Sequence, residues 1–100
     1  MNTYKYQVTI SFVNKIDHEF MLKIPEHRAY INRLILSEVI DTYAISAERS
    51  MGWILMNAKS EAQIHTYLEK SPLYPYLTIN IDQLMVYDSR MYRFPKMVLN

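Results

Sequence analysis

The spacing of hydrophobic residues alternates between strand-like and helix-like periods along this chain, and this alternation most constrains its fold. Residues 4–12 alternate apolar with polar side chains, which predicts a strand with one apolar face. Over residues 17–37 the spacing of apolar positions changes to three and four, and the stripe comprises Phe20, Ile24, His27, Ile31 and Leu34. That spacing predicts a helix with one buried face and with Asp17 as its N-cap. Pro25 predicts a kink or a short opening turn, because proline lacks an N–H.

A hairpin is predicted next. Residues 39–47 and 51–58 have strand-like compositions, and the polar residues 48–50 connect them, which is typical of two paired strands with a short loop. The second arm is apolar on both faces, with Met51, Trp53 and Leu55 on one and Ile54, Met56 and Ala58 on the other. Such a strand is expected at the centre of a sheet and covered on both sides.

The last third of the chain repeats the order of helix and strand. Ser60 and Gln63 have the spacing of a capping box ahead of a second helix, which Ser71-Pro72 is expected to end. Residues 76–86 form the last predicted strand. Residues 88–100 have no clear period but keep several large apolar side chains, so we expect this tail to pack on the same or a partner protomer.

The order β-α-β-β-α-β predicts an α+β, ferredoxin-like fold over residues 1–87, with a four-stranded antiparallel sheet and two helices on one face. The other face of the sheet would then be bare, although the central strand is apolar there too. A second copy packed sheet to sheet would cover that face and leave polar residues lining a cavity. The residues expected to bind a ligand are Thr9, Ser11, Trp53, Tyr74 and Asn80.

Composition excludes several classes of function. Eleven Lys and Arg against ten Asp and Glu leave too little excess positive charge for nucleic-acid binding as the main role. The absence of Cys and the single Gly exclude thiolate metal sites, phosphate loops and dinucleotide-binding motifs. Three scattered histidines predict no metal site, and no cofactor is expected. No targeting or membrane-spanning segment is visible, so we expect a cytoplasmic protein without a membrane partner.

The run Pro72-Leu73-Tyr74-Pro75-Tyr76, which leads into the last predicted strand and is followed by Leu84, resembles the muconolactone Δ-isomerase family. The likeness extends at the level of pattern over roughly residues 4–87. It implies a dimeric α+β barrel, in which the sheets of two ferredoxin-like protomers face each other. The fold carries over with the resemblance, whereas the reaction does not follow from it. If the protein is an enzyme, we expect a cofactor-independent isomerase.

The chain departs from the family at two positions that matter for activity. The isomerases carry Leu-Trp-Arg on the second strand, where this chain has Tyr43-Ala44-Ile45, and they end the last strand with His-Pro, where it has Tyr87-Asp88-Ser89. Two hypotheses follow. The protein is either a divergent member that binds a small organic molecule without catalysis, or an active isomerase that moves a proton on a small lactone.

Proton transfer on a lactone needs a group that removes and returns a proton, and donors for the charge that develops. The candidate catalytic residues are Glu26, His27, Asp41 and Tyr43, with Asp41 and Tyr43 expected on one face of their strand. Arg28 and Arg49 are candidates for binding a carboxylate. The alternative interpretation makes His27 a core histidine bonded to a backbone carbonyl, or a partly exposed one near Pro25, and leaves both arginines on a solvated helix or hairpin surface.

Overall fold

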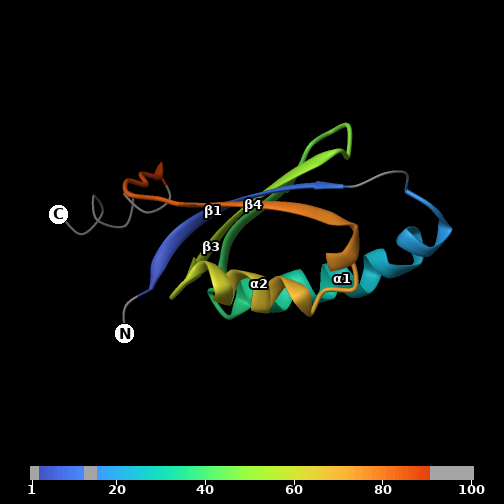
Figure 1. The fold of residues 1–100 in the computed structure, drawn as a ribbon, viewed down its shortest axis with the longest axis horizontal. Coiled ribbons are helices and arrows are strands. Elements are labelled where there is room, and N and C mark those ends of the chain that lie inside the picture. Colours follow the sequence, from blue (N-terminus) through green and yellow to red (C-terminus); the bar gives the residue numbers. More distant parts are fainter. Residues whose placement is uncertain (1–2, 13–15, 91–100) are drawn as a thin grey trace.

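Four strands form one antiparallel sheet, and both helices cover the same face of it (Figure 1). The computed structural model describes residues 3–12 and 16–90. The elements are β1 (Tyr4–Phe12), α1 (His18–Leu36), β2 (Ile40–Ile45), β3 (Met51–Ala58), α2 (Glu61–Glu69) and β4 (Leu77–Gln83), with a 3-10 turn (Tyr74–Tyr76) before β4. The strand order β2-β3-β1-β4 places β1 and β3 in the interior. This is the predicted α+β, ferredoxin-like fold.

The hydrophobic core lies between the sheet and the two helices. Val8 of β1 and Ile54 of β3 face each other across the strand pair, and both are almost completely buried. Ile64 and Leu68 of α2 belong to the same cluster of buried side chains. The period of two in the strands and of three to four in the helices therefore directs one face of each element into a shared interior.

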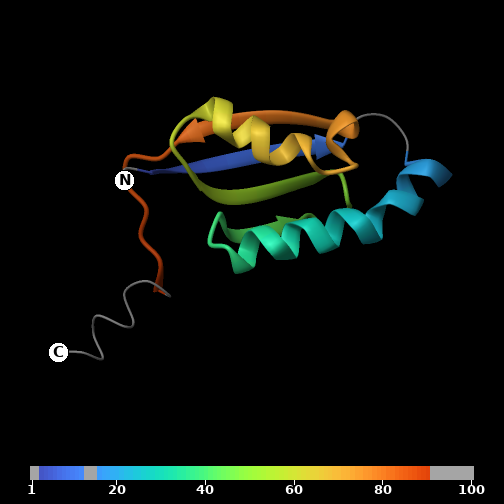
Figure 2. The same ribbon diagram turned by 90° about the horizontal axis from the view of Figure 1, so that it is seen from below.

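Helix α1 begins where the sequence predicts it. The Asp17 carboxylate accepts a hydrogen bond of 2.9 Å from the Phe20 N–H, which satisfies one of the free donors at a helix start. The helix continues through Pro25, and its ribbon changes direction between the first turns and the rest (Figure 2). Of the predicted stripe, Phe20, His27, Ile31 and Leu34 are buried.

The structure differs from the sequence-based prediction mainly at the ends of elements. Strand β4 starts at Leu77 rather than at residue 76, because the chain first makes the 3-10 turn that contains Pro75. Ser60 caps α2 as predicted by accepting from the Gln63 N–H, but Gln63 Oε1 accepts from the Lys59 N–H. Residues 91–100 of the predicted tail lie outside the described residues.

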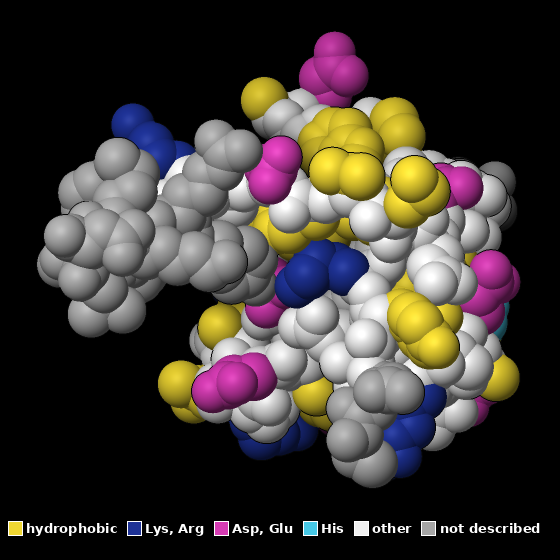
Figure 3. Space-filling model, turned by 90° about the vertical axis from the view of Figure 1, so that its left-hand side faces the viewer, with side chains coloured by type: hydrophobic (Ala, Val, Ile, Leu, Met, Phe, Trp, Pro, Cys, Tyr) yellow, Lys and Arg dark blue, Asp and Glu magenta, His cyan; other side chains and the backbone are white. Residues whose placement is uncertain are grey.

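The face of the sheet away from the helices is partly apolar. Strand β3 lies between β2 and β1, as predicted for a central strand. On its outer face Leu55 is 4% exposed, whereas Met51 and Trp53 are 37% and 38% exposed. Hydrophobic side chains gather at the top of Figure 3, on the side of the molecule away from the helices. The prediction that β3 is covered on both faces is therefore confirmed within one chain for Leu55, whereas Met51 and Trp53 stay partly exposed.

None of the helices that the structure describes combines the length and the apolar character that crossing a membrane requires.

Candidate functional site

A cavity of about 600 Å³ opens between the N-terminal half of α1 and the hairpin end of the sheet. This volume falls in the range of small-molecule sites, about 300 to 1,000 Å³. Most of the wall is aliphatic or aromatic, and the polar exceptions are His27, Arg28, Tyr43 and Arg49. The remaining lining residues are Phe12, Ile16, Phe20, Met21, Ile24, Ile45 and Leu73.

His27 and Tyr43 meet at this cavity from two different elements. The buried stripe of α1 directs His27 toward the sheet, where the side chain is 5% exposed. Tyr43 of β2 is in register with Ile54 and faces the helices. His27 Nε2 lies 2.8 Å from the Tyr43 hydroxyl, and His27 Nδ1 lies 2.6 Å from Ser71 Oγ. Both ring nitrogens therefore have hydrogen-bond partners.

Burial keeps both members of this pair uncharged. It lowers the pKa of His27 from 6.5 to about 4, and the positive charge of Arg28 acts in the same direction. Burial also raises the pKa of the Tyr43 hydroxyl, an effect that Arg28 opposes. At neutral pH the pair is thus a neutral imidazole beside a neutral phenol.

Two arginines, both of them exposed to solvent, add positive charge to the wall of the cavity. Arg28 follows His27 on α1, and Arg49 comes from the loop between β2 and β3. That loop is held by the Ser46 hydroxyl, which accepts from the N–H groups of Ser50 and Met51 at 3.2 Å. None of the described residues that line the cavity is acidic. The two guanidinium groups therefore favour an anionic ligand.

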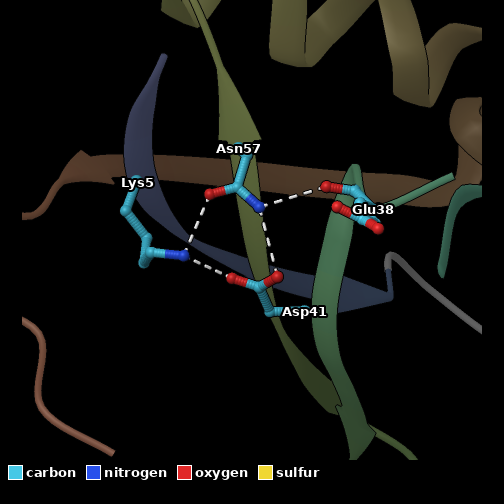
Figure 4. A network of polar contacts seen from close by, with 4 residues as sticks. All are labelled: Lys5, Glu38, Asp41 and Asn57. Atoms are coloured by element: carbon cyan, nitrogen blue, oxygen red, sulfur yellow. Dashed lines mark hydrogen bonds and ion pairs between the residues drawn. The ribbon is translucent and has the colours of Figure 1, made fainter. Parts of the chain in front are cut away.

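The two predicted carboxylates lie elsewhere. Glu26 is exposed on α1 and does not line the cavity. Asp41 lies at an irregularity in the register between β2 and β3, and it pairs with Lys5 and accepts from Asn57 Nδ2 (Figure 4). Lys5 also donates to Asn57 Oδ1 at 2.9 Å.

The expectation that Asp41 and Tyr43 share a face of β2 is wrong. A β-bulge places two residues opposite one and changes which side the next side chains face. Asp41 consequently joins Lys5 and Asn57 at the sheet surface, whereas Tyr43 reaches the interior beside His27.

The residues predicted to bind a ligand lie apart from this cavity. Thr9 is in register with Trp53 on one side and with Asn80 on the other, so the three form a row on the outer face of the sheet. Ser11 lies on the same face of β1. Tyr74 is in neither group, because its hydroxyl lies 3.2 Å from His65 Nδ1.

Ser71 does not line the cavity, but it contacts the lining residue His27, and no sequence pattern singles it out. It is buried, it directly follows the turn that ends α2, and its hydroxyl contacts His27 from 44 positions along the chain. The sequence predicts only that a helix ends at Ser71-Pro72. No local pattern predicts a contact with His27, which is 44 positions away.

No group of three or more His, Asp or Glu side chains suited to a metal ion occurs within the described part of the chain.

Comparison of the chain with models of protein families gives no match, and comparison with curated proteins gives none either.

Proposed function

We propose that this protein binds a small organic acid in the cavity beside α1 and is a muconolactone-isomerase-like protein of the dimeric α+β barrel type. A cytoplasmic location is part of the proposal. The observation that carries it is the combination of an apolar cavity of about 600 Å³ with Arg28, Arg49 and the His27–Tyr43 pair in its wall.

The chemistry of the wall defines the ligand class. Aliphatic and aromatic side chains favour an apolar body, because they remove its surface from water. Two arginines in the wall favour a ligand that carries a carboxylate. A compound with both parts, such as an aromatic or lactone-bearing acid, matches this wall better than a sugar or a cation does.

An active isomerase is the alternative, and the contact between His27 and Tyr43 inside the cavity favours it. A proton-transfer enzyme needs a group that accepts a proton from carbon. The described residues lining the cavity supply no carboxylate for this step, which is why we place binding first.

Titration of the protein with phenylacetate and with muconolactone, monitored by NMR, tests this function. We expect both acids to perturb the signals of Tyr43 and Leu73, and we expect neutral phenylacetamide to bind at least about tenfold more weakly, since it lacks the charge that pairs with arginine. Arg49→Gln is expected to weaken phenylacetate binding about tenfold.

Arg33→Gln is the matched control, because Arg33 belongs to the same helix as Arg28 but contacts the Tyr30 ring away from the cavity. Equal binding of the acid and the amide, or perturbation only outside the cavity, would contradict the proposal. Conversion of muconolactone by the wild type, with loss of the reaction in Tyr43→Phe, would instead establish the isomerase alternative.

The dimer is the second part of the proposal, and the exposed Met51 and Trp53 on the outer face of the sheet support it. We expect light scattering at micromolar concentration to give twice the protomer mass of 12.0 kDa. Trp53→Lys is expected to shift this mass toward the protomer, because it introduces a charge into the apolar contact. A wild-type mass of 12.0 kDa would exclude the dimer.

A further inference from the structure

Ser71, His27 and Tyr43 form one continuous chain of hydrogen bonds that begins at a backbone amide and ends in the cavity. The Leu73 N–H donates to Ser71 Oγ at 3.0 Å. Ser71 Oγ lies 2.6 Å from His27 Nδ1, and His27 Nε2 lies 2.8 Å from the Tyr43 hydroxyl. Only the last member of this chain, Tyr43, is partly exposed.

The direction of donation along this chain follows from counting donors and acceptors. A neutral imidazole donates from one nitrogen and accepts at the other. With the proton on Nδ1, Ser71 would accept from both the imidazole and the Leu73 N–H. The buried Ser71 O–H would then have no acceptor among the described residues, and an unpaired buried donor is costly.

With the proton on Nε2, every buried donor is satisfied. The Ser71 O–H donates to Nδ1, and Nε2–H donates to the Tyr43 oxygen. The Tyr43 O–H is then the remaining donor, and it belongs to a residue that lines the cavity. None of the described residues has a buried side-chain nitrogen or oxygen without a partner, which agrees with this assignment.

We propose that Ser71 is a positioning residue: by fixing His27 with its proton on Nε2, it makes the Tyr43 hydroxyl a hydrogen-bond donor to a ligand oxygen in the cavity. Neither ring nitrogen of His27 then bonds a ligand, because Nδ1 accepts from Ser71 and Nε2 donates to Tyr43. The part that concerns a ligand rests on the proposed binding function, whereas the proton position does not.

The turn around Ser71 is suited to this role because it is held on both sides. The Ser71 N–H donates to the Leu68 carbonyl at 3.0 Å, and the Ser71 carbonyl accepts from the Tyr74 N–H at 3.1 Å. A Ser side chain that accepts from an N–H two residues ahead also stabilises such turns. The hydroxyl therefore reaches His27 from a fixed backbone, as a positioning group must.

A ligand that bonds the Tyr43 O–H must meet a requirement beyond the negative charge that the arginines recognise. Arginine recognises the negative charge of an acid, whereas a phenol O–H requires an oxygen that accepts a hydrogen bond. A ligand that satisfies both requirements carries a carboxylate and a second oxygen that accepts a hydrogen bond, such as a lactone carbonyl.

Nitrogen-15 NMR of the imidazoles tests the proton position directly, without any ligand. In the wild type at pH 7.5 we expect His27 to show a protonated Nε2 and an unprotonated Nδ1 as a single neutral form. In Ser71→Ala we expect a second form with the proton on Nδ1 to become populated, because the donor to Nδ1 is gone. His65 is the internal control and is expected to keep its wild-type signals.

A wild-type His27 with its proton on Nδ1, or with both forms mixed, would overturn the assignment. An unchanged single form in Ser71→Ala would overturn the role of Ser71. If that variant does not fold, the wild-type spectrum decides the proton position, and Ser71→Cys, which keeps a weaker donor, is expected to show an intermediate population of the second form.

Binding of muconolactone then tests the ligand part. We expect Tyr43→Phe to weaken its binding about tenfold and Ser71→Ala about threefold, while Arg33→Gln leaves it unchanged. An undiminished affinity in Tyr43→Phe would overturn the donor role. Failure of all acids to bind, with the proton found on Nε2, would refute the binding function and leave the proton assignment standing.

Discussion

Replacing Ile54 by alanine is expected to lower the free energy of unfolding by about 3 to 4 kcal/mol, the largest effect of any single change considered for this chain. Ile54 is 1% exposed and lies between Val8 of β1 and Tyr43 of β2 in the strand register. Loss of its side chain removes apolar burial and leaves a cavity that interior strands cannot close. Urea denaturation at one fixed protein concentration measures the change.

Leu36→Ala is the matched control for Ile54→Ala. It removes a similar apolar side chain at the end of α1, but Leu36 is 83% exposed, so a change of no more than about 0.5 kcal/mol is expected. Similar losses in the two variants would show that the packing of β3 between its neighbours does not carry the stability assigned to it.

Acid is expected to destabilise the protein through His27. The folded chain holds the pKa of His27 at about 4 because the ring is buried, whereas the usual value is 6.5. Between these two pH values the unfolded chain binds a proton that the folded chain does not, so stability falls as the pH falls. The full shift corresponds to about 3 kcal/mol.

Measurement of unfolding between pH 7 and pH 4 in the wild type and in His27→Gln separates this contribution from that of the carboxylates. The variant is expected to be less stable at pH 7, because it loses the bonds to Ser71 and Tyr43, and to show a flatter pH dependence. His18→Gln, which alters an exposed histidine, is expected to keep the wild-type slope. Parallel slopes in all three proteins would contradict the assignment.

Local patterns were sufficient to predict the fold. Asp17 and Ser60 cap their helices through bonds to residues three positions ahead. Such short-range contacts can be predicted from the sequence. The alternation in β1 and the stripe in α1 each involve one element and its buried face. The order of the elements then leaves few ways to arrange four strands and two helices.

Four of the predicted candidates, His27, Tyr43, Arg28 and Arg49, line the cavity, whereas the two carboxylates do not. His27 belongs to the buried stripe of α1, and its burial follows from spacing alone. Asp41 was misplaced, because the bulge in β2 accompanies pairing with Lys5 and Asn57, both far away in the chain. Ser71 was missed for the same reason, since its contact with His27 exists only after α2 and α1 pack on one sheet.

At position 49 of the hairpin loop, the residue that best suits the backbone differs from the residue that suits the proposed ligand. Arg49 has a backbone φ of 65°, a left-handed conformation that is unfavourable for most side chains by roughly 1 kcal/mol and is adopted freely by glycine. Yet Arg49 lines the cavity. Random variants selected only for heat tolerance would therefore drift toward glycine or asparagine at this position, whereas selection for ligand retention would keep arginine.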